Sequence, residues 1–257
     1  MKICMVARTT LKHSPGGMQE DLQTLADGAV KAGHCVTVIT TRRPDGIRGG
    51  ETSGVEIHYL PDTIPESYKG GFYGKAYQRF AELDRNIGFD LVHSQSIAAL
   101  AFAGKVSQPI VARFHGVWFS ESDYTPPVWR MLTFRERFQV LLRLPQVYRS
   151  YSRLQWFGTR VDRILVDSQF AFRELLRTHR RLDPSKIRCI YPGVDVEKFR
   201  PLERETAKEQ LGLRGLVLLY LSRLSIAKGG RLALRAFEGL NRKDVTLVIA
   251  GDRKSVV

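Results

Sequence analysis

Cysteine is scarce in this sequence of 257 residues, and long uncharged hydrophobic runs are missing from it. The three cysteines, Cys4, Cys35 and Cys189, are odd in number and form no Cys-x-x-Cys pair. Each lies in a short apolar run that is typical of a strand. We therefore expect buried thiols in a reducing compartment, and no disulfide framework.

The hydrophobic runs are too short for a membrane span or a signal peptide. Met1 to Ala7 is apolar for only a few residues before Arg8, and no later run is long and uncharged enough to cross a bilayer. The sequence therefore predicts a cytoplasmic protein. Peripheral contact with the inner face of the membrane is the form of membrane association that it leaves open.

Acidic residues are fewer than basic ones, and repeats and low-complexity tracts are missing. The 26 acidic side chains face 40 basic ones, which gives a formal charge of +14 and favours phosphates, nucleic acid or an acidic bilayer as partners. A hydrophobic content of 43% with 26% charged residues is near the globular average, which excludes global disorder.

Strand-like and helix-like segments alternate along most of the chain. Short β-branched and apolar runs predict strands at 2–7, 35–40, 55–59, 91–93, 110–114, 164–168 and 187–190. Apolar spacing of three and four residues predicts helices at 18–30, 75–87 and 96–106. Such alternation favours an α/β fold with a doubly wound parallel sheet.

Irregular sequence rich in turn residues predicts a domain boundary. We assign 1–195 to a first Rossmann-like domain, 196–213 to a linker, and 214–257 to the start of a second Rossmann-like domain. In that last segment, strands at 216–221 and 245–250 flank a helix at 230–240. Because two strands and one helix cannot bury their own faces, we expect this second domain to be truncated.

At three positions of the first domain, residues that could bind a ligand lie at or after the end of a predicted strand. Gly16-Gly17 follows the first strand, where missing side chains let the backbone approach an anion at a helix N-terminus, although the pattern is not G-x-G-x-x-G. His115 directly follows the strand at 110–114, at the sheet edge where open α/β sheets bind ligands. His93 has the same placement. Each also has a purely structural explanation, as a tight turn or a histidine bonded to a loop carbonyl.

The second domain offers one phosphate-binding candidate. Arg223 and Lys228 lie between a strand and a helix that begins at Gly229-Gly230. An arginine binds phosphate oxygens in pairs, a lysine adds a point charge, and the helix dipole supports both. Either cation alone would be an ordinary solvated charge, so their joint placement carries the interpretation.

Taken in order, these motifs resemble glycosyltransferase family 4, of GT-B architecture and group 1-like retaining type. The resemblance spans nearly the whole chain. It rests on Gly16-Gly17-Met18-Gln19, His115-Gly116, Val166-Asp167-Ser168, Tyr191 to Pro201, and Ser222-Arg223-Leu224 through Lys228-Gly229.

The resemblance implies roles for individual residues. Arg223 and Lys228 would hold the donor diphosphate, His115 would contact the transferred sugar as the catalytic residue, and Gly16, Gly17, His93 and Ser168 would line the cleft. It implies a nucleotide-sugar co-substrate, a glycan or lipid-linked acceptor, retention of configuration, and no cofactor or metal. The family's glutamate pair and base pocket would lie beyond residue 257, so we expect this fragment to be inactive alone.

A basic aromatic insert at about 117–160 interrupts the alternation. From Trp118 to Arg163 inclusive there are eight arginines and no lysine, interleaved with aromatic residues. An apolar face at Met131, Phe134, Phe138 and Leu141-Leu142 predicts amphipathic helices. The insert fits docking on an anionic membrane. It equally fits packing on the domain's own sheet, with the arginines solvated or lining the acceptor cleft.

Two other functional classes remain open at this point. A GT-B sugar-nucleotide epimerase would share the fold but need acid/base carboxylates in the cleft. A non-catalytic basic binding module, for nucleic acid among other ligands, would explain the charge and the arginine-aromatic pattern. Because no nucleic-acid motif is present, we predict no nucleic-acid partner.

Overall fold

The computed structural model describes residues 1–115, 133–142, 144–222 and 228–251. The chain divides into two compact units, one formed by 1–118 with 144–193 and the other by 119–143 with 194–257.

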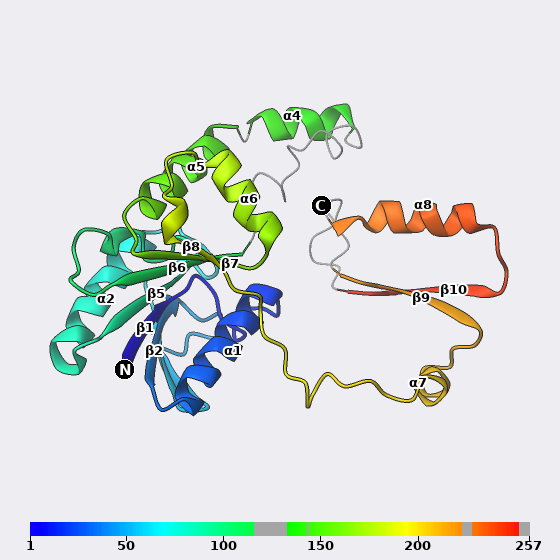
Figure 1. The fold of residues 1–257 in the computed structure, drawn as a ribbon, viewed down its shortest axis with the longest axis horizontal. Helices are drawn as coiled ribbons and strands as arrows, with labels where there is room; N and C mark the ends of the chain where they lie inside the picture. Colours follow the sequence, from blue (N-terminus) through cyan, green and yellow to red (C-terminus); the bar gives the residue numbers. More distant parts are fainter. Residues whose placement is uncertain (116–132, 143, 223–227, 252–257) are drawn as a thin grey trace. The chain divides into compact units, whose positions relative to one another are not determined.

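The first unit is built on an eight-stranded sheet in the order β3-β4-β2-β1-β5-β6-β7-β8 (Figure 1). Its strands are β1 Lys2–Val6, β2 Cys35–Thr41, β3 Gly49–Thr52, β4 Val55–Leu60, β5 Leu91–Gln95, β6 Ile110–Phe114, β7 Arg163–Val166 and β8 Ile187–Cys189. All neighbours pair in parallel except β3 with β4, which is antiparallel. The doubly wound parallel sheet is confirmed, with β3 as an edge strand that the sequence analysis did not predict.

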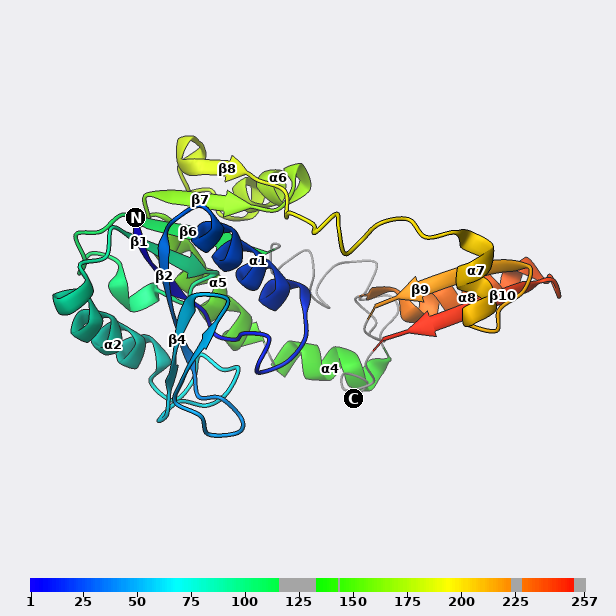
Figure 2. The same ribbon diagram turned by 90° about the horizontal axis from the view of Figure 1, so that it is seen from below.

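Helices cover both faces of this sheet (Figures 1 and 2). They are α1 Gly17–Lys31, α2 Phe72–Ile87, α5 Leu144–Gly158 and α6 Gln169–Thr178, with short 3₁₀ turns η1 Leu100–Phe102 and η2 Pro184–Lys186. Leu22 and Ala26 of α1 pack into one apolar cluster with residues of β1, β2 and β4. The other helices bury their apolar sides in a separate, larger cluster.

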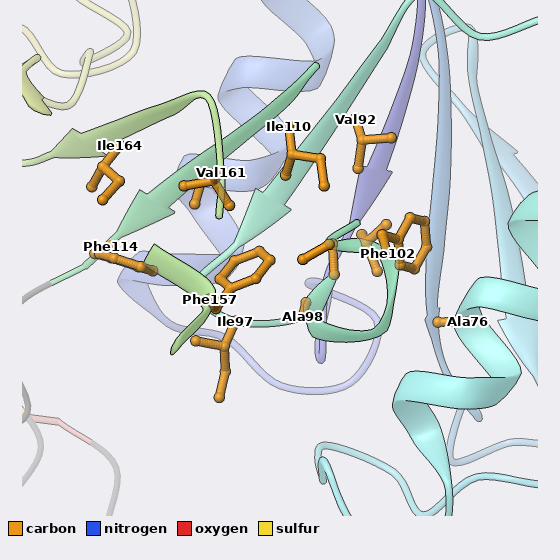
Figure 3. Packing of buried hydrophobic residues seen from close by; sticks show 14 of the residues in the cluster. Ala76, Val92, Ile97, Ala98, Phe102, Ile110, Phe114, Phe157, Val161 and Ile164 are labelled. Carbon is orange, nitrogen blue, oxygen red and sulfur yellow. The ribbon is translucent and has the colours of Figure 1, made fainter. Parts of the chain in front are cut away.

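The larger cluster fixes the position of α5 on the sheet. Phe157 of α5 and Phe102 of η1 are completely buried, and they lie among the side chains of β5, β6 and β7 (Figure 3). Gly158 at the end of α5 allows close packing, because a Cβ there would come within 2.7 Å of Leu182 Cδ2 and that side chain would have to shift. One side of α5 is thus committed to the core.

The helix expected over 96–106 does not form, and only the short turn η1 is present. Ser94 explains the difference: its hydroxyl donates to the Ser96 carbonyl (2.9 Å) and accepts from the Ala99 backbone N–H (3.0 Å). Ser96 also has a φ of 56°, in the left-handed region. A side chain that bonds the local backbone competes with the helical pattern.

The second unit holds three helices and a two-stranded sheet within its described residues. The elements are α4 Phe134–Leu142, α7 Arg204–Gln210, β9 Leu216–Leu221, α8 Gly230–Leu240 and β10 Val245–Ala250. Strands β9 and β10 pair in parallel, as the sequence predicted. Leu219 and Leu221 of β9 are 62% and 74% exposed, so this sheet leaves apolar side chains uncovered.

The cysteine prediction was correct for one thiol of three. All three cysteines are free, but only Cys4 is buried, whereas Cys35 is exposed and Cys189 is half-buried. Cys35 is the first residue of β2 and lies at the sheet margin, outside the core. Cys4 lies inside β1, where burial raises the pKa of its thiol and keeps it protonated.

Candidate functional site

The carboxyl ends of β5, β6 and β7 gather a cluster of polar side chains. These strands are neighbours in the sheet, with Gln95 of β5 opposite Arg113 of β6, and Phe114 opposite Val166 of β7. The cluster consists of Asp21 from α1, Gln95, Arg113, His115 and Asp167, and we refer to it as the His115 cluster. It occupies the sheet edge at which open α/β sheets bind ligands.

His115 is held on both sides of its ring. Its Nδ1 lies 2.9 Å from Asp167 Oδ2, and its Nε2 contacts the side-chain oxygen of Gln95 and lies 3.6 Å from Asp21 Oδ2. A carboxylate at Nδ1 selects the tautomer that carries its proton there. In that neutral tautomer Nε2 accepts a hydrogen bond. The Gln95 side-chain amide can donate it if its oxygen and nitrogen exchange places, since the amide nitrogen has no hydrogen-bond partner among the described residues.

Arg113 ties the two carboxylates together from inside the sheet. Its side chain is only 5% exposed, and its Nε and Nη2 lie 2.8 Å and 2.9 Å from the two oxygens of Asp21. Nη2 also lies 3.1 Å from Asp167 Oδ1. One guanidinium thus compensates two carboxylates and fixes the geometry around His115.

The imidazole of His115 remains reachable from outside. Its side chain is 13% exposed, and that of Asp167 is 22% exposed. A partly exposed ring with a fixed tautomer, beside two carboxylates and an amide, can hydrogen-bond the hydroxyl groups of a ligand. Such an arrangement is chemically suited to polar, hydroxyl-rich molecules.

The glycine loop adjoins this cluster through α1. Gly16 precedes the helix and Gly17 opens it, and Asp21 lies one turn further along. A Cβ at Gly17 would meet no atom within 4 Å, so space beside the backbone is open there. The loop is also fixed in place, because His13 Nε2 lies 3.2 Å from the carbonyl oxygens of Thr41 and Arg42.

His93 lies deeper than a ligand contact would. Its side chain is buried within β5, and neither ring nitrogen has a hydrogen-bond partner among the described residues. Burial, and then the neighbouring Arg113 and His115 side chains, lower the pKa of His93 to about 3. The ring is therefore neutral at physiological pH, and its role as a cleft residue stays a prediction.

Ser168 has a structural task next to the cluster. It is the N-cap of α6, and its hydroxyl accepts a hydrogen bond from the Ala171 backbone N–H at 3.0 Å. This bond satisfies one of the free donors at the start of the helix. Ser168 directly follows Asp167 in the sequence. Its contact with a ligand stays a prediction.

The two predicted phosphate-binding cations belong to the second unit. Arg223 lies outside the described residues. Lys228 is exposed and lies immediately before Gly229, the N-cap of α8, and its carbonyl accepts a hydrogen bond from the Tyr220 hydroxyl at 3.0 Å. Lys228 is thus at the start of an eleven-residue helix, where the dipole favours an anion.

Sequence reasoning found His115, named Asp167 only within the Val166-Asp167-Ser168 motif, and missed Asp21, Gln95 and Arg113. These residues come from separate parts of the chain: Asp21 from α1, Gln95 from β5, Arg113 from β6, and Asp167 from the position directly after β7. The ion-paired Arg113 and Asp21 are 92 positions apart. One clue was available: Arg113 is the only charged residue in the apolar strand 110–114. Among the described residues, no group of three or more His, Cys, Asp or Glu side chains is arranged to hold a metal ion.

Residues 15–198 match the family described as Glycosyltransferase Family 4. A 92-residue stretch is 36% identical to D-inositol 3-phosphate glycosyltransferase of Mycobacterium marinum, covering 35% of this chain and 19% of that relative. The corresponding protein of Mycobacterium leprae is 38% identical over 92 residues, covering 35% and 21%. The alignments thus span about a fifth of these curated relatives.

Solved structures share the fold over nearly the whole chain. Sucrose-phosphate synthase of Thermosynechococcus elongatus superposes with a TM-score of 0.75 at 16% identity, covering 96% of this chain and 61% of that one. Anabaena HepE in complex with UDP-glucose gives a TM-score of 0.63 at 16% identity, covering 97% and 60%. UDP-N-acetylglucosamine 2-epimerase gives 0.51 at 15% identity. The GT-B fold expected from the sequence is confirmed, and the epimerase is the weaker match.

Proposed function

This chain belongs to Glycosyltransferase Family 4, and from that membership we propose that the whole protein transfers a hexosyl group from a nucleotide-sugar donor to an acceptor. The observation that carries the proposal is the His115 cluster, which gathers at the strand ends where such sheets bind ligands. In this proposal His115 contacts the transferred sugar, and Asp167 and Gln95 hold its ring in position. No cofactor and no metal take part.

Donor binding is assigned to the second unit. Lys228 at the start of α8, together with Arg223, binds the diphosphate and stabilises the negative charge that develops on it. The exposure of Lys228 and the dipole of α8 support this assignment. The superposition with HepE, whose structure holds UDP-glucose, supports a nucleotide-sugar as the donor class.

Transfer proceeds with retention of configuration. The acceptor hydroxyl oxygen bonds to the anomeric carbon as the bond from that carbon to the diphosphate breaks. The acceptor proton passes to an oxygen of the departing diphosphate, so no protein carboxylate needs to act as base. The carboxylates of Asp21 and Asp167 are occupied by Arg113 and His115, which fits this division of labour.

Residues 1–257 by themselves do not catalyse the transfer in this proposal. The chain spans 61% of the length of sucrose-phosphate synthase, and β9 and β10 form a sheet of only two strands. An epimerase would instead convert the nucleotide sugar into its epimer without any acceptor and with no net release of nucleotide. Activity measurements with and without acceptor therefore separate the two functions.

The test compares the product of the complete gene with residues 1–257. UDP-, GDP- and ADP-sugars are scanned by thermal shift, and nucleotide release is measured with and without acceptor. We expect one donor to stabilise the complete protein, with the stabilisation lost in Arg223→Ala and Lys228→Ala. His115→Ala should bind that donor and lose turnover. Turnover by residues 1–257 alone, or full activity in all three variants, would contradict the proposal.

We further propose that the protein associates peripherally with anionic membranes through α5. Tyr148 is 73% and Trp156 43% exposed. Arg149 and Arg153 lie on the same helix, and Arg160 lies two residues beyond its end. The Arg160 guanidinium lies 4.3 Å from the centre of the Trp156 ring. Aromatic rings and arginines suit the interfacial region of an anionic bilayer.

The alternative, that the insert packs on the domain, holds for only part of the insert. In α5, Val147 and Phe157 do pack inward, which leaves the opposite side free. In α4, Phe134 and Phe138 are 86% and 57% exposed, while Met131 lies outside the described residues. None of the described helices is long and apolar enough to cross a bilayer.

Vesicle sedimentation tests the association. We expect binding to phosphatidylglycerol vesicles, weak binding to phosphatidylcholine vesicles, and a steep loss with added salt. Arg149→Gln combined with Arg160→Gln should weaken it, and Arg173→Gln on α6 serves as the matched exposed control. Equal binding to both lipids would contradict the proposal. Salt-sensitive binding of random oligonucleotides would favour the nucleic-acid alternative instead.

A further inference from the structure

A cavity of about 670 Å³ lies on the first unit beside α5, away from the His115 cluster. Its lining comes from α2, from η1 and the turn that follows it, and from α5. The lining residues are Tyr73, Leu100, Ala101, Ala103, Lys105, Tyr148, Arg149, Ser152, Arg153 and Trp156. We call it the α5 pocket. Its volume is within the range of pockets that hold small molecules.

The α5 pocket combines apolar walls with positive charge. Leucine, alanine and aromatic side chains form most of the surface, and Lys105, Arg149 and Arg153 are its only charged members. Within the described part of the chain, no ion pair involves any of these three cations. An occupant that complements this lining has a hydrocarbon body and an anionic end.

Two of the cations lie over aromatic rings and keep their donors free. The Arg153 guanidinium is 5.8 Å from the centre of the Tyr73 ring, and Lys105 Nζ is 5.1 Å from that of Tyr77. Such cation–π contacts position the charged group and leave N–H groups available for an anion. The pocket is therefore organised before any ligand arrives.

A short chain of contacts connects the pocket with the His115 cluster. Tyr73 stacks on Tyr68 with ring centres 5.2 Å apart and planes 14° apart. The Tyr68 hydroxyl donates to the Gln95 carbonyl at 3.4 Å, and the Gln95 side chain contacts His115. Burial raises the pKa of Tyr68 and of Tyr73, so both rings stay neutral and present apolar faces.

From this placement we propose that the α5 pocket binds the hydrocarbon chain of a lipid-phosphate acceptor, with the phosphate bound by Arg149, Arg153 and Lys105. The inference rests on the proposed glycosyl transfer and names the class of acceptor that the first unit receives. A single hydrocarbon chain fits the apolar walls of this open pocket. The contacts through Tyr73 and Tyr68 connect this pocket to the cluster that contacts the sugar in the proposed function.

Binding is tested with residues 1–257 and decyl phosphate below its micelle concentration, by calorimetry. Octyl phosphate, decanol and inorganic phosphate are the comparison ligands. We expect about four-fold tighter binding for each added methylene, and loss of most affinity when the phosphate is replaced by a hydroxyl. Inorganic phosphate should bind too weakly to measure. Equal affinity for decanol and decyl phosphate would overturn the proposal.

Two kinds of variant locate the binding. Ser152→Trp fills the pocket from an exposed position of α5, and it should weaken decyl phosphate binding at least ten-fold. Gln146→Trp is the matched control, because Gln146 is exposed on the same helix and lies outside the pocket lining. Arg149→Gln with Arg153→Gln should remove the preference for phosphate. Unchanged affinity in Ser152→Trp would overturn the assignment.

Membrane docking and acceptor binding give different results. If α5 only docks on bilayers, phosphatidylglycerol vesicles bind while dispersed decyl phosphate does not, and the pocket proposal is overturned. In the complete protein, Ser152→Trp should raise KM for a lipid-phosphate acceptor more than Gln146→Trp does. Absence of acceptor-dependent nucleotide release in the wild type would instead contradict the proposed function, while decyl phosphate binding is read independently.

Discussion

Arg113 compensates two carboxylates from inside the sheet, and its replacement isolates the energetic role of that contact. Arg113→Met keeps the length of the side chain but leaves Asp21 and Asp167 as poorly solvated charges. We expect the free energy of unfolding to fall by about 3 kcal/mol, measured by urea denaturation.

A second substitution distinguishes uncompensated charge from lost packing. Adding Asp21→Asn to Arg113→Met should restore part of the stability, because one isolated carboxylate is removed. Arg177→Met is the control, since Arg177 is 69% exposed in its pair with Glu174, and its loss should change stability little. Equal losses of unfolding free energy in Arg113→Met and Arg177→Met would show that the contacts of Arg113 with Asp21 and Asp167 do not stabilise the fold.

His93 makes stability depend on pH. Its pKa is lowered to about 3 in the folded protein by burial, so below the usual value near 6.5 the unfolded chain takes up a proton that the folded chain does not. His93 therefore does not lower the free energy of unfolding above about pH 6.5, and it lowers that free energy progressively as the pH decreases towards 3. His93→Leu removes this contribution. We expect its loss of stability between pH 7 and pH 5 to be smaller than that of the wild type by about 2 kcal/mol, in urea titrations at both values.

At the scale of elements, the start of α6 is set by one hydroxyl. Ser168→Ala removes the acceptor for the Ala171 N–H and should cost about 1 kcal/mol of stability, seen as a lower urea midpoint. Ser168→Asp preserves the cap and should preserve stability. If Ser168 also contacts ligand, Ser168→Asp would be stable but would lose activity in the complete protein, whereas a purely structural role predicts normal activity.

The elements also show what local sequence could and could not predict. The strands at 110–114 and 216–221 form where predicted, because runs of apolar and β-branched residues between turns determine them locally. The helix predicted at 96–106 does not form, because the Ser94 hydroxyl hydrogen-bonds the local backbone. His115 was found by its position after a strand. Its partners were not, because the contact of Asp21 with Arg113 depends on how α1 packs on the sheet.

At the scale of the whole molecule, the two units differ in how their sheets are protected. The eight strands of the first unit are covered by helices on both faces, and Val6, Val92 and Ala112 are completely buried. Strands β9 and β10 pair only with each other within the described residues. A two-stranded sheet has little independent stability in water.

Hydrogen exchange followed by mass spectrometry should reveal this difference in residues 1–257. We expect amides of β9 and β10 to exchange through local opening, well before those of β1, β5 and β6, which should open only with global unfolding. Added urea should accelerate exchange in the first unit more strongly, since its opening exposes more surface. Equal protection in both sheets, with the same urea dependence, would mean that the two units unfold as one, and that β9 and β10 are stabilised by contacts beyond their own pairing.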